Sequence, residues 1–146
     1  MTHQLPNPVS ADDGVWVQFD VDSEPVLVRS DQWVGFDFDG VLSTEKPGVE
    51  LDLQDLGIPV HAMVDWARKL VVAGVRVKIF TARACEPGNE NRIQDWTEQH
   101  GLGRLEVTNA KDYGLIRYYD DRAIQVIPVL GESVKAQMKG RKYEQQ

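Results

Sequence analysis

The chain lacks the features of several protein classes. It has one cysteine, Cys85, so it can form no disulfide bond within itself. No apolar run approaches the roughly 20 residues of a membrane-spanning helix. The segment Met1 to Ser10 is polar and has no apolar core of a signal peptide. We therefore expect a cytoplasmic protein that neither spans nor binds a membrane.

Basic residues and histidines are also few. The chain has 16 Lys and Arg against 23 Asp and Glu, and its net charge is −7. An extended nucleic-acid surface needs clustered Lys and Arg, so we expect none. The three histidines are scattered without metal-ligand spacing. A small phosphorylated substrate stays compatible with this charge, because a metal ion and a few cationic groups can reverse the field locally.

What the sequence does contain is an alternation of strand and helix patterns. We predict helices at 60–71 and 91–100, and strands at 33–38, 75–80, 105–107, 115–119 and 123–127. Gly74 stands where a glycine commonly ends a helix. Alternating strands and helices favour right-handed βαβ units. The fold class is therefore α/β, with a three-layer, Rossmann-like arrangement around a short parallel sheet that is covered on both faces.

The region before residue 32 has a different pattern. Val15, Val17, Phe19 and Val21 alternate with polar residues, and turn-forming residues follow before a short return strand at 25–29. This predicts a β-hairpin whose exposed edge can pair with a second copy of the chain. We divide the chain into an N-terminal tail and hairpin (1–31), a catalytic domain (32–130) and a C-terminal tail (131–146), in which a weak surface helix is expected.

Candidate site residues close or follow four strands of the predicted sheet. They are Asp37, Asp39 and Gly40 at the end of the first strand, Thr81, Ala82 and Arg83 after the second, Lys111 after the third, and Asp120 and Asp121 after the fourth. In open parallel sheets, ligands bind beyond the carboxyl ends of the strands. We therefore expect these groups to converge on one crevice, where Gly40 permits a close backbone approach to a phosphate.

This combination of groups suits phosphoryl transfer. A carboxylate can attack phosphorus and divide one difficult step into two easier ones. A divalent cation with oxygen ligands, Mg²⁺ above all, must screen the charge of the ester. A lysine and a hydroxyl can hold the phosphoryl oxygens, and a second acid can protonate the leaving group.

The ordered set of motifs resembles the haloacid dehalogenase superfamily of phosphohydrolases. Over about residues 32–127 the chain has Asp-x-Asp-Gly-Val, then Thr81, then Lys111, then Asp120-Asp121, each after an apolar strand except the lysine. The resemblance implies Asp37 as nucleophile, Asp39 as general acid and base, and Thr81 and Lys111 as phosphate-holding residues. It implies that Mg²⁺ is held by Asp37, the backbone carbonyl of Asp39, Asp120, and Asp121 directly or through water.

Two features set the chain apart within that resemblance. The interval 43–59 is too short for a large cap domain, so we expect a nearly capless protein with at most a small flap. About thirty residues precede the core strand, which normally begins such chains, and Val41 stands where many members have threonine.

Plainer interpretations remain open for several residues. Asp20-Val21-Asp22 also spells Asp-x-Asp, but no glycine or apolar step follows it, which favours a solvated hairpin face. Lys111 is not bracketed by a tight motif, and lysines are usually solvated. Arg83 is either a substrate contact or an ordinary surface arginine.

The leading hypothesis is a Mg²⁺-dependent phosphatase that forms an aspartyl-phosphate on Asp37, with a small phosphorylated metabolite or nucleotide as substrate. One alternative keeps this chemistry but takes the phosphorylated end of a nucleic acid. Another is a phosphate-binding or phosphorylatable regulatory domain without turnover. The sequence identifies neither the substrate nor the oligomeric state.

Overall fold

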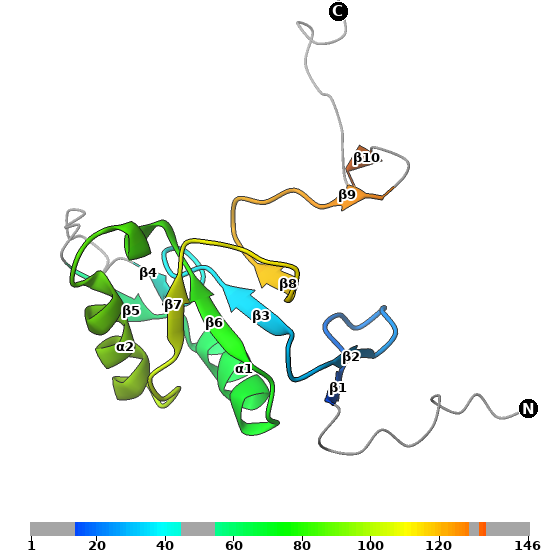
Figure 1. The fold of residues 1–146 in the computed structure, drawn as a ribbon, viewed down its shortest axis with the longest axis horizontal. Helices are drawn as coiled ribbons and strands as arrows, with labels where there is room; N and C mark the ends of the chain where they lie inside the picture. The colour runs from blue at the N-terminus through cyan, green and yellow to red at the C-terminus, as the bar shows by residue number, and fades with distance from the viewer. Residues whose placement is uncertain (1–13, 45–54, 129–131, 134–146) are drawn as a thin grey trace, which may run out of the picture.

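The computed structural model describes residues 14–44, 55–128 and 132–133. Its centre is a four-stranded sheet with the order β7-β6-β3-β8, in which every neighbouring pair is parallel (Figure 1). The strands are β3 (Trp33–Phe36), β6 (Val77–Phe80), β7 (Glu106–Thr108) and β8 (Leu115–Tyr119). The predicted α/β class and parallel sheet are confirmed.

Two helices pack against one face of this sheet. They are α1 (His61–Val72), between β3 and β6, and α2 (Asn89–Gln99), between β6 and β7. The buried residues of α1 recur at a spacing of three, which places them on one side of a helix. They join the inward residues of the strands in a single apolar core, whose members include Val34, Phe36, Ile79, Val64, Leu70 and Ile93. Neither helix is long and apolar enough to cross a bilayer.

The other face of the sheet is covered differently. The chain passes from β7 to β8 through the loop 109–114, which contains no helix. This loop is tied to Trp33, whose backbone N–H donates to Gly114 O at 2.7 Å and whose indole N–H donates to the Asp112 carboxylate at 2.8 Å. No helix of the described residues lies on this face, so the predicted third layer is not found among them.

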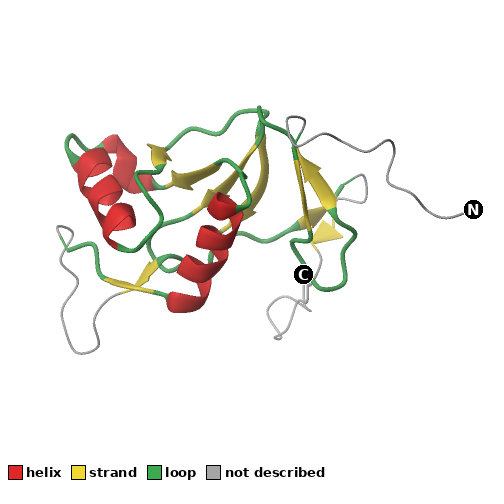
Figure 2. Ribbon diagram, turned by 90° about the horizontal axis from the view of Figure 1, so that it is seen from below, coloured by secondary structure: helices red, strands yellow, loops and turns green. Residues whose placement is uncertain are grey.

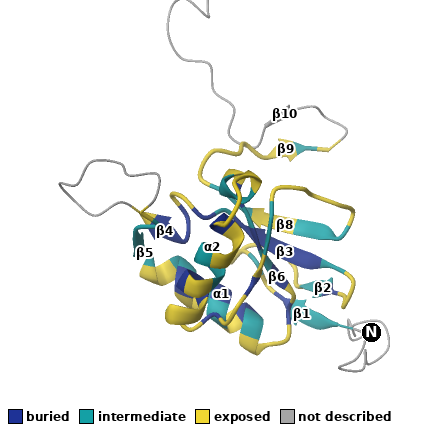
Figure 3. Cartoon of the chain, turned by 60° about the vertical axis from the view of Figure 1, so that its left-hand side comes forward, coloured by how far each residue is buried: buried dark blue, intermediate teal, exposed yellow. Residues whose placement is uncertain are grey.

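Burial differs strongly between the central strand and its outer neighbour. β3 is buried along its whole length, whereas β8 is half-buried or exposed (Figure 3). The edge of the sheet at β8 therefore has less apolar cover than the centre.

The N-terminal hairpin is confirmed, although its strands are shorter than predicted. β1 (Val15–Val17) pairs antiparallel with β2 (Val26–Val28), and Val17 and Val28 are buried in the core. The predicted alternation to Val21 ends early, because the Gln18 amide donates to the carbonyls of Val21 and Ser23 and folds the chain into a turn. The hairpin and α2 lie at opposite ends of the long axis (Figures 1 and 2).

The predicted strand at 123–127 does not extend the main sheet. Only β9 (Val126–Ile127) forms, and it pairs antiparallel with β10 (Glu132–Ser133) apart from the central strands (Figure 1). An antiparallel neighbour needs only a short loop, whereas a further parallel strand needs a long crossover connection that returns to the end of the sheet where the strands begin. The local pairing therefore forms in place of a fifth parallel strand.

The predicted flap is described only at its base. There β4 (Ser43–Thr44) pairs antiparallel with β5 (Ile58–Pro59). The structure does not describe the middle of the flap (45–54) or the N-terminal tail (1–13). The weak helix expected in the C-terminal tail also lies outside the described residues, except at 132–133, which form β10. A short 3₁₀ helix, η1 (Ala82–Cys85), was not predicted.

Candidate phosphate and metal site

Three carboxylates meet where β3 and β8 end. Phe36 and Tyr119 are register partners at the ends of these adjacent parallel strands, so the residues that follow them are neighbours. The Asp37 backbone N–H continues the ladder by donating to Tyr119 O at 2.9 Å. One carboxylate oxygen from each of Asp37, Asp120 and Asp121 lies within 4.8 Å of the others. We call these three residues the acid trio.

The acid trio concentrates negative charge in a partly buried place. The pKa of Asp37 is raised to about 6, first by burial and further by Asp120 and Asp121, while a hydrogen bond from the Phe38 N–H opposes the rise. No lysine or arginine of the described residues forms an ion pair with the trio. Close carboxylates without a cationic partner are the oxygen ligands that suit Mg²⁺, so these residues fit that ion.

Gly40 allows the backbone to pass close to the acid trio. Its φ is +83°, and a Cβ at this position would stand 2.4 Å from an Asp121 carboxylate oxygen. Any other residue would therefore be strained and would also collide with that carboxylate. The structure thus explains the glycine by its closeness to the Asp121 carboxylate, and the predicted approach to a phosphate stays a prediction.

Asp39 does not join the trio with its side chain. Arg83 binds it through two hydrogen bonds, from Nε to Oδ2 at 2.7 Å and from Nη2 to Oδ1 at 2.8 Å. The Arg83 side chain is only 13% exposed, and the bond to Asp39 raises the pKa of its guanidinium. The candidate acid and base and the candidate substrate-binding arginine thus form one ion pair.

Thr81 directly follows β6 and organises the turn that presents Arg83. It is 3% exposed, its backbone N–H donates to Thr108 O at 2.9 Å, and its hydroxyl accepts from the Arg83 N–H at 3.2 Å. The hydroxyl therefore caps η1, which begins with the exposed Ala82. The hydroxyl also carries a proton, which is free of this capping role and can be donated.

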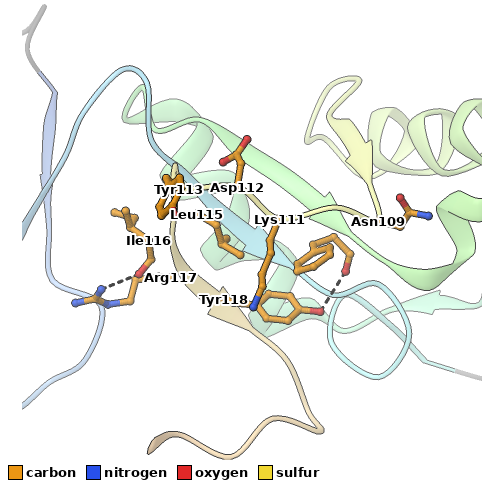
Figure 4. Close-up of a pocket in the computed structure, with 9 residues that line it drawn as sticks. Asn109, Lys111, Asp112, Tyr113, Leu115, Ile116, Arg117 and Tyr118 are labelled. Atoms are coloured by element: carbon orange, nitrogen blue, oxygen red, sulfur yellow. Dashed lines mark hydrogen bonds between the residues drawn. The ribbon is translucent and has the colours of Figure 1, made fainter. Parts of the chain in front are cut away.

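Lys111 stands on the loop 109–114 rather than within the trio. It is exposed and lines a groove of about 890 Å³ together with Tyr118, and its side chain runs toward the Tyr118 ring (Figure 4). It forms no ion pair with a described residue. Its predicted contact with a phosphate stays a prediction.

Tyr118 is a residue of the site that the sequence did not single out. Its hydroxyl donates to Phe80 O at 3.2 Å. Its pKa is raised well above the ordinary value by burial and by the negative charges of the acid trio, so the hydroxyl stays protonated near those carboxylates. In the sequence it is one of two tyrosines in a strand, and only the alternation of side chains hints that it faces away from the core.

The second Asp-x-Asp sequence is placed elsewhere. Asp20 and Asp22 are exposed in the turn between β1 and β2, where Asp20 O accepts from the Ser23 N–H at 3.2 Å. Neither belongs to the trio. The favoured interpretation of this segment as a solvated hairpin agrees with this placement.

Comparison of the chain with models of known families, with characterised proteins and with solved structures gives no significant match. The functional argument therefore rests on the motifs and on the geometry described above.

Proposed function

We propose that this chain is a Mg²⁺-dependent phosphatase that hydrolyses phosphate monoesters through an aspartyl-phosphate on Asp37. The observation that carries the proposal is the convergence of the acid trio from two adjacent strands, with its oxygens within 4.8 Å of one another. Residues 37 and 120 are far apart in sequence, and their meeting is what a shared cation requires. The ordered motifs that resemble the haloacid dehalogenase superfamily support the same reaction.

In this proposal the acid trio holds Mg²⁺ with the backbone carbonyl of Asp39. The ion supplies charge screening for the approach of an anionic ester. An Asp37 oxygen attacks phosphorus while the bond from phosphorus to the leaving oxygen breaks. Once Arg83 has released it, Asp39 takes up a proton from solvent and gives it to that leaving oxygen. It later takes a proton from the water whose oxygen attacks phosphorus as the bond from phosphorus to Asp37 breaks.

The ion pair between Asp39 and Arg83 must open during this cycle. A guanidinium binds phosphate oxygens in the same forked manner as a carboxylate. An incoming phosphoryl group thus competes with Asp39 for Arg83, and the exchange releases Asp39 to act on the leaving group. Thr81 and Lys111 complete the set of donors around the phosphoryl oxygens.

Phosphate release from a chromogenic phosphate ester tests the proposal. We expect turnover with Mg²⁺, none with EDTA, and a loss of at least about 10³-fold in Asp37→Asn. Asp39→Asn should lose about 10²- to 10⁴-fold, because it removes the acid and base. Asp22→Asn is the matched control, since it makes the same change in the other Asp-x-Asp sequence.

Turnover that survives EDTA or persists in Asp37→Asn would contradict the proposal. A phosphoryl group that stayed on Asp37 for hours would instead identify a regulatory domain that accepts phosphate without releasing it.

A further inference from the structure

The groove beside Lys111 lies on the face of the sheet that no described helix covers. It has a volume of about 890 Å³ and runs between the loop 109–114 and the outward residues of β6 and β8, with Phe80, Tyr113 and Tyr118 among its lining (Figure 4). Sites for small molecules commonly have volumes of about 300–1,000 Å³ and aromatic walls. The groove therefore has the size and the lining of a ligand site.

The Tyr118 ring lies flat across the sheet in this groove. Tyr118 belongs to β8, yet its hydroxyl bonds to Phe80 O on β6, so the side chain must cross the intervening strand β3. It crosses at Gly35, where a Cβ would come within 3.3 Å of the ring atom Cδ1. Gly35 thus makes room for one face of the ring. The side chain is not enclosed, because Tyr118 is 36% exposed.

A second ring extends this platform. The Phe80 and Tyr118 rings lie with centroids 4.9 Å apart at an angle of 40°. Tyr118 is held by its hydrogen bond, so little conformational entropy is lost when another flat group stacks on it. The platform is therefore built before any ligand binds.

One part of the groove, at Phe80 and Tyr118, adjoins residues of the phosphate site. Tyr118 stands two residues before Asp120, and Phe80 directly precedes Thr81. The negative charge of the acid trio acts on the Tyr118 hydroxyl, and the Lys111 side chain runs along the groove toward the ring (Figure 4). This adjacency is the reason for placing on the rings the leaving group of an ester that is bound at the trio.

We propose that this groove binds a nucleobase stacked on Tyr118, and that the substrate is a nucleoside phosphate monoester. The inference rests on the proposed function for its reaction but not for its binding site. Every base has a flat face, so stacking on an aromatic side chain tolerates any base. Lys111 supplies positive charge at the junction between base and phosphate. A free nucleotide and the phosphorylated end of a strand share this chemistry.

Turnover of adenosine 5′-monophosphate and ribose 5-phosphate, which differ only in the base, tests the inference. We expect kcat/KM to be about tenfold or more higher for the nucleotide. Tyr118→Leu should remove most of this preference, whereas Tyr118→Phe should keep it because the ring remains. Thermal unfolding of both variants checks that they fold, and the comparison of the two substrates needs no variant at all.

Binding separates this inference from the proposed reaction. Titration calorimetry on the wild-type chain and on Asp37→Asn with both ligands should show tighter binding of the nucleotide, and Tyr118→Leu should abolish the difference. If both esters are hydrolysed or bound equally well, the nucleobase site is wrong while the phosphatase stands. If the nucleotide binds preferentially through Tyr118 but is not hydrolysed, the reaction is wrong and the site stands. If the chain neither binds nor hydrolyses the two esters, both the nucleobase site and the phosphatase reaction are wrong.

A third substrate, a 5′-phosphorylated oligonucleotide, distinguishes a free nucleotide from the phosphorylated end of a strand. Faster turnover of the oligonucleotide than of the mononucleotide would support the stacked base and assign it to a strand end. Turnover of the mononucleotide alone would support it and assign a free nucleotide. Equal turnover of the oligonucleotide in the wild type and Tyr118→Leu would contradict stacking for that substrate.

Discussion

Two groups of charged residues lie beyond the carboxyl ends of the strands, and they differ in whether a cation compensates their negative charge. In the acid trio, three carboxylates face one another without a cationic partner among the described residues. Beside it, Asp39 is neutralised by the two hydrogen bonds of Arg83. Asp37 and Asp39 belong to the same short motif, so the difference arises within a few residues of backbone.

The backbone turn after Phe38 produces this difference. Phe38 O accepts hydrogen bonds from the N–H groups of Leu42 at 3.1 Å and Ser43 at 2.9 Å, so the strand ends and curls. Asp37 stays beside β8, and the Asp39 side chain is carried toward η1. In the proposed reaction the first carboxylate would bind a cation and the second would exchange a proton, and the turn separates the residues for these two tasks.

The largest expected effect is on the stabilisation by Mg²⁺, which should differ between variants of the acid trio and variants of Asp39. Binding to the folded state alone stabilises it by about 2.7 kcal/mol when the ion is at 100 times its dissociation constant. We expect this gain in the wild type and most of it in Asp39→Asn, because in the proposed site Asp39 would contribute only its backbone oxygen, which the substitution keeps. Asp120→Asn should lose most of the gain. Thermal unfolding across a Mg²⁺ titration measures all three.

If Asp39→Asn and Asp120→Asn lose the stabilisation by Mg²⁺ equally, the distinction between the acid trio and Asp39 is wrong. In that case the Asp39 carboxylate would be a ligand, and its pairing with Arg83 would belong only to the metal-free protein. Ca²⁺ in place of Mg²⁺ serves as a comparison, since it accepts more irregular oxygen shells.

The pH dependence of stability should reveal the cost of ionising Asp37 in the folded chain, which arises first from burial and then from Asp120 and Asp121. Asp37 has a pKa of about 6 in the folded chain against 3.8 in a model peptide, so between these values the folded state binds more protons than the unfolded state. In EDTA the free energy of unfolding should therefore fall as the pH rises from about 4 to 6. A pKa rise of this size corresponds to about 3 kcal/mol, and solvent screening at a half-buried carboxyl lowers it to roughly 1–2 kcal/mol.

Asp37→Asn isolates this contribution. The variant should lack that part of the pH slope, and at neutral pH without metal it should be more stable than the wild type while it loses activity. Parallel stability curves for the two proteins would mean that neither burial nor the neighbouring carboxylates raise the pKa of Asp37 in the folded chain.

The parts of this fold with strong local patterns were predictable from the sequence. The helix expected at 60–71 forms as α1, and the strand expected at 115–119 forms as β8 with the same bounds. Periodicity sets these elements because it reports which side of each one is buried. The convergence of Asp37 with Asp120 and Asp121 was predictable too, since residues after parallel strands share one edge of the sheet.

Features that depend on contacts across the fold were not predictable in this way. The Arg83 pair with Asp39 depends on the turn after Phe38, and the flat Tyr118 ring depends on Gly35 in a different strand. The prediction of a strand at 123–127 in the main sheet was wrong because an apolar pattern does not specify a pairing partner, and without one Ile124 and Val126 stay exposed. Sequence periodicity specifies the faces of an element, whereas these features depend on which elements meet.

The smallest expected effect concerns Arg83 itself. Arg83→Met keeps the length of the side chain and removes its charge, so the free energy of unfolding should fall by about 1 kcal/mol. Arg104→Met is the matched control, because Arg104 is 42% exposed and pairs with an Asp95 that is 66% exposed, and exposed pairs contribute little. Urea unfolding measures both. Steady-state kinetics then give Arg83 its role: a higher KM would mean that the arginine moves to the substrate phosphate, whereas a lower kcat at unchanged KM would mean that it only positions Asp39.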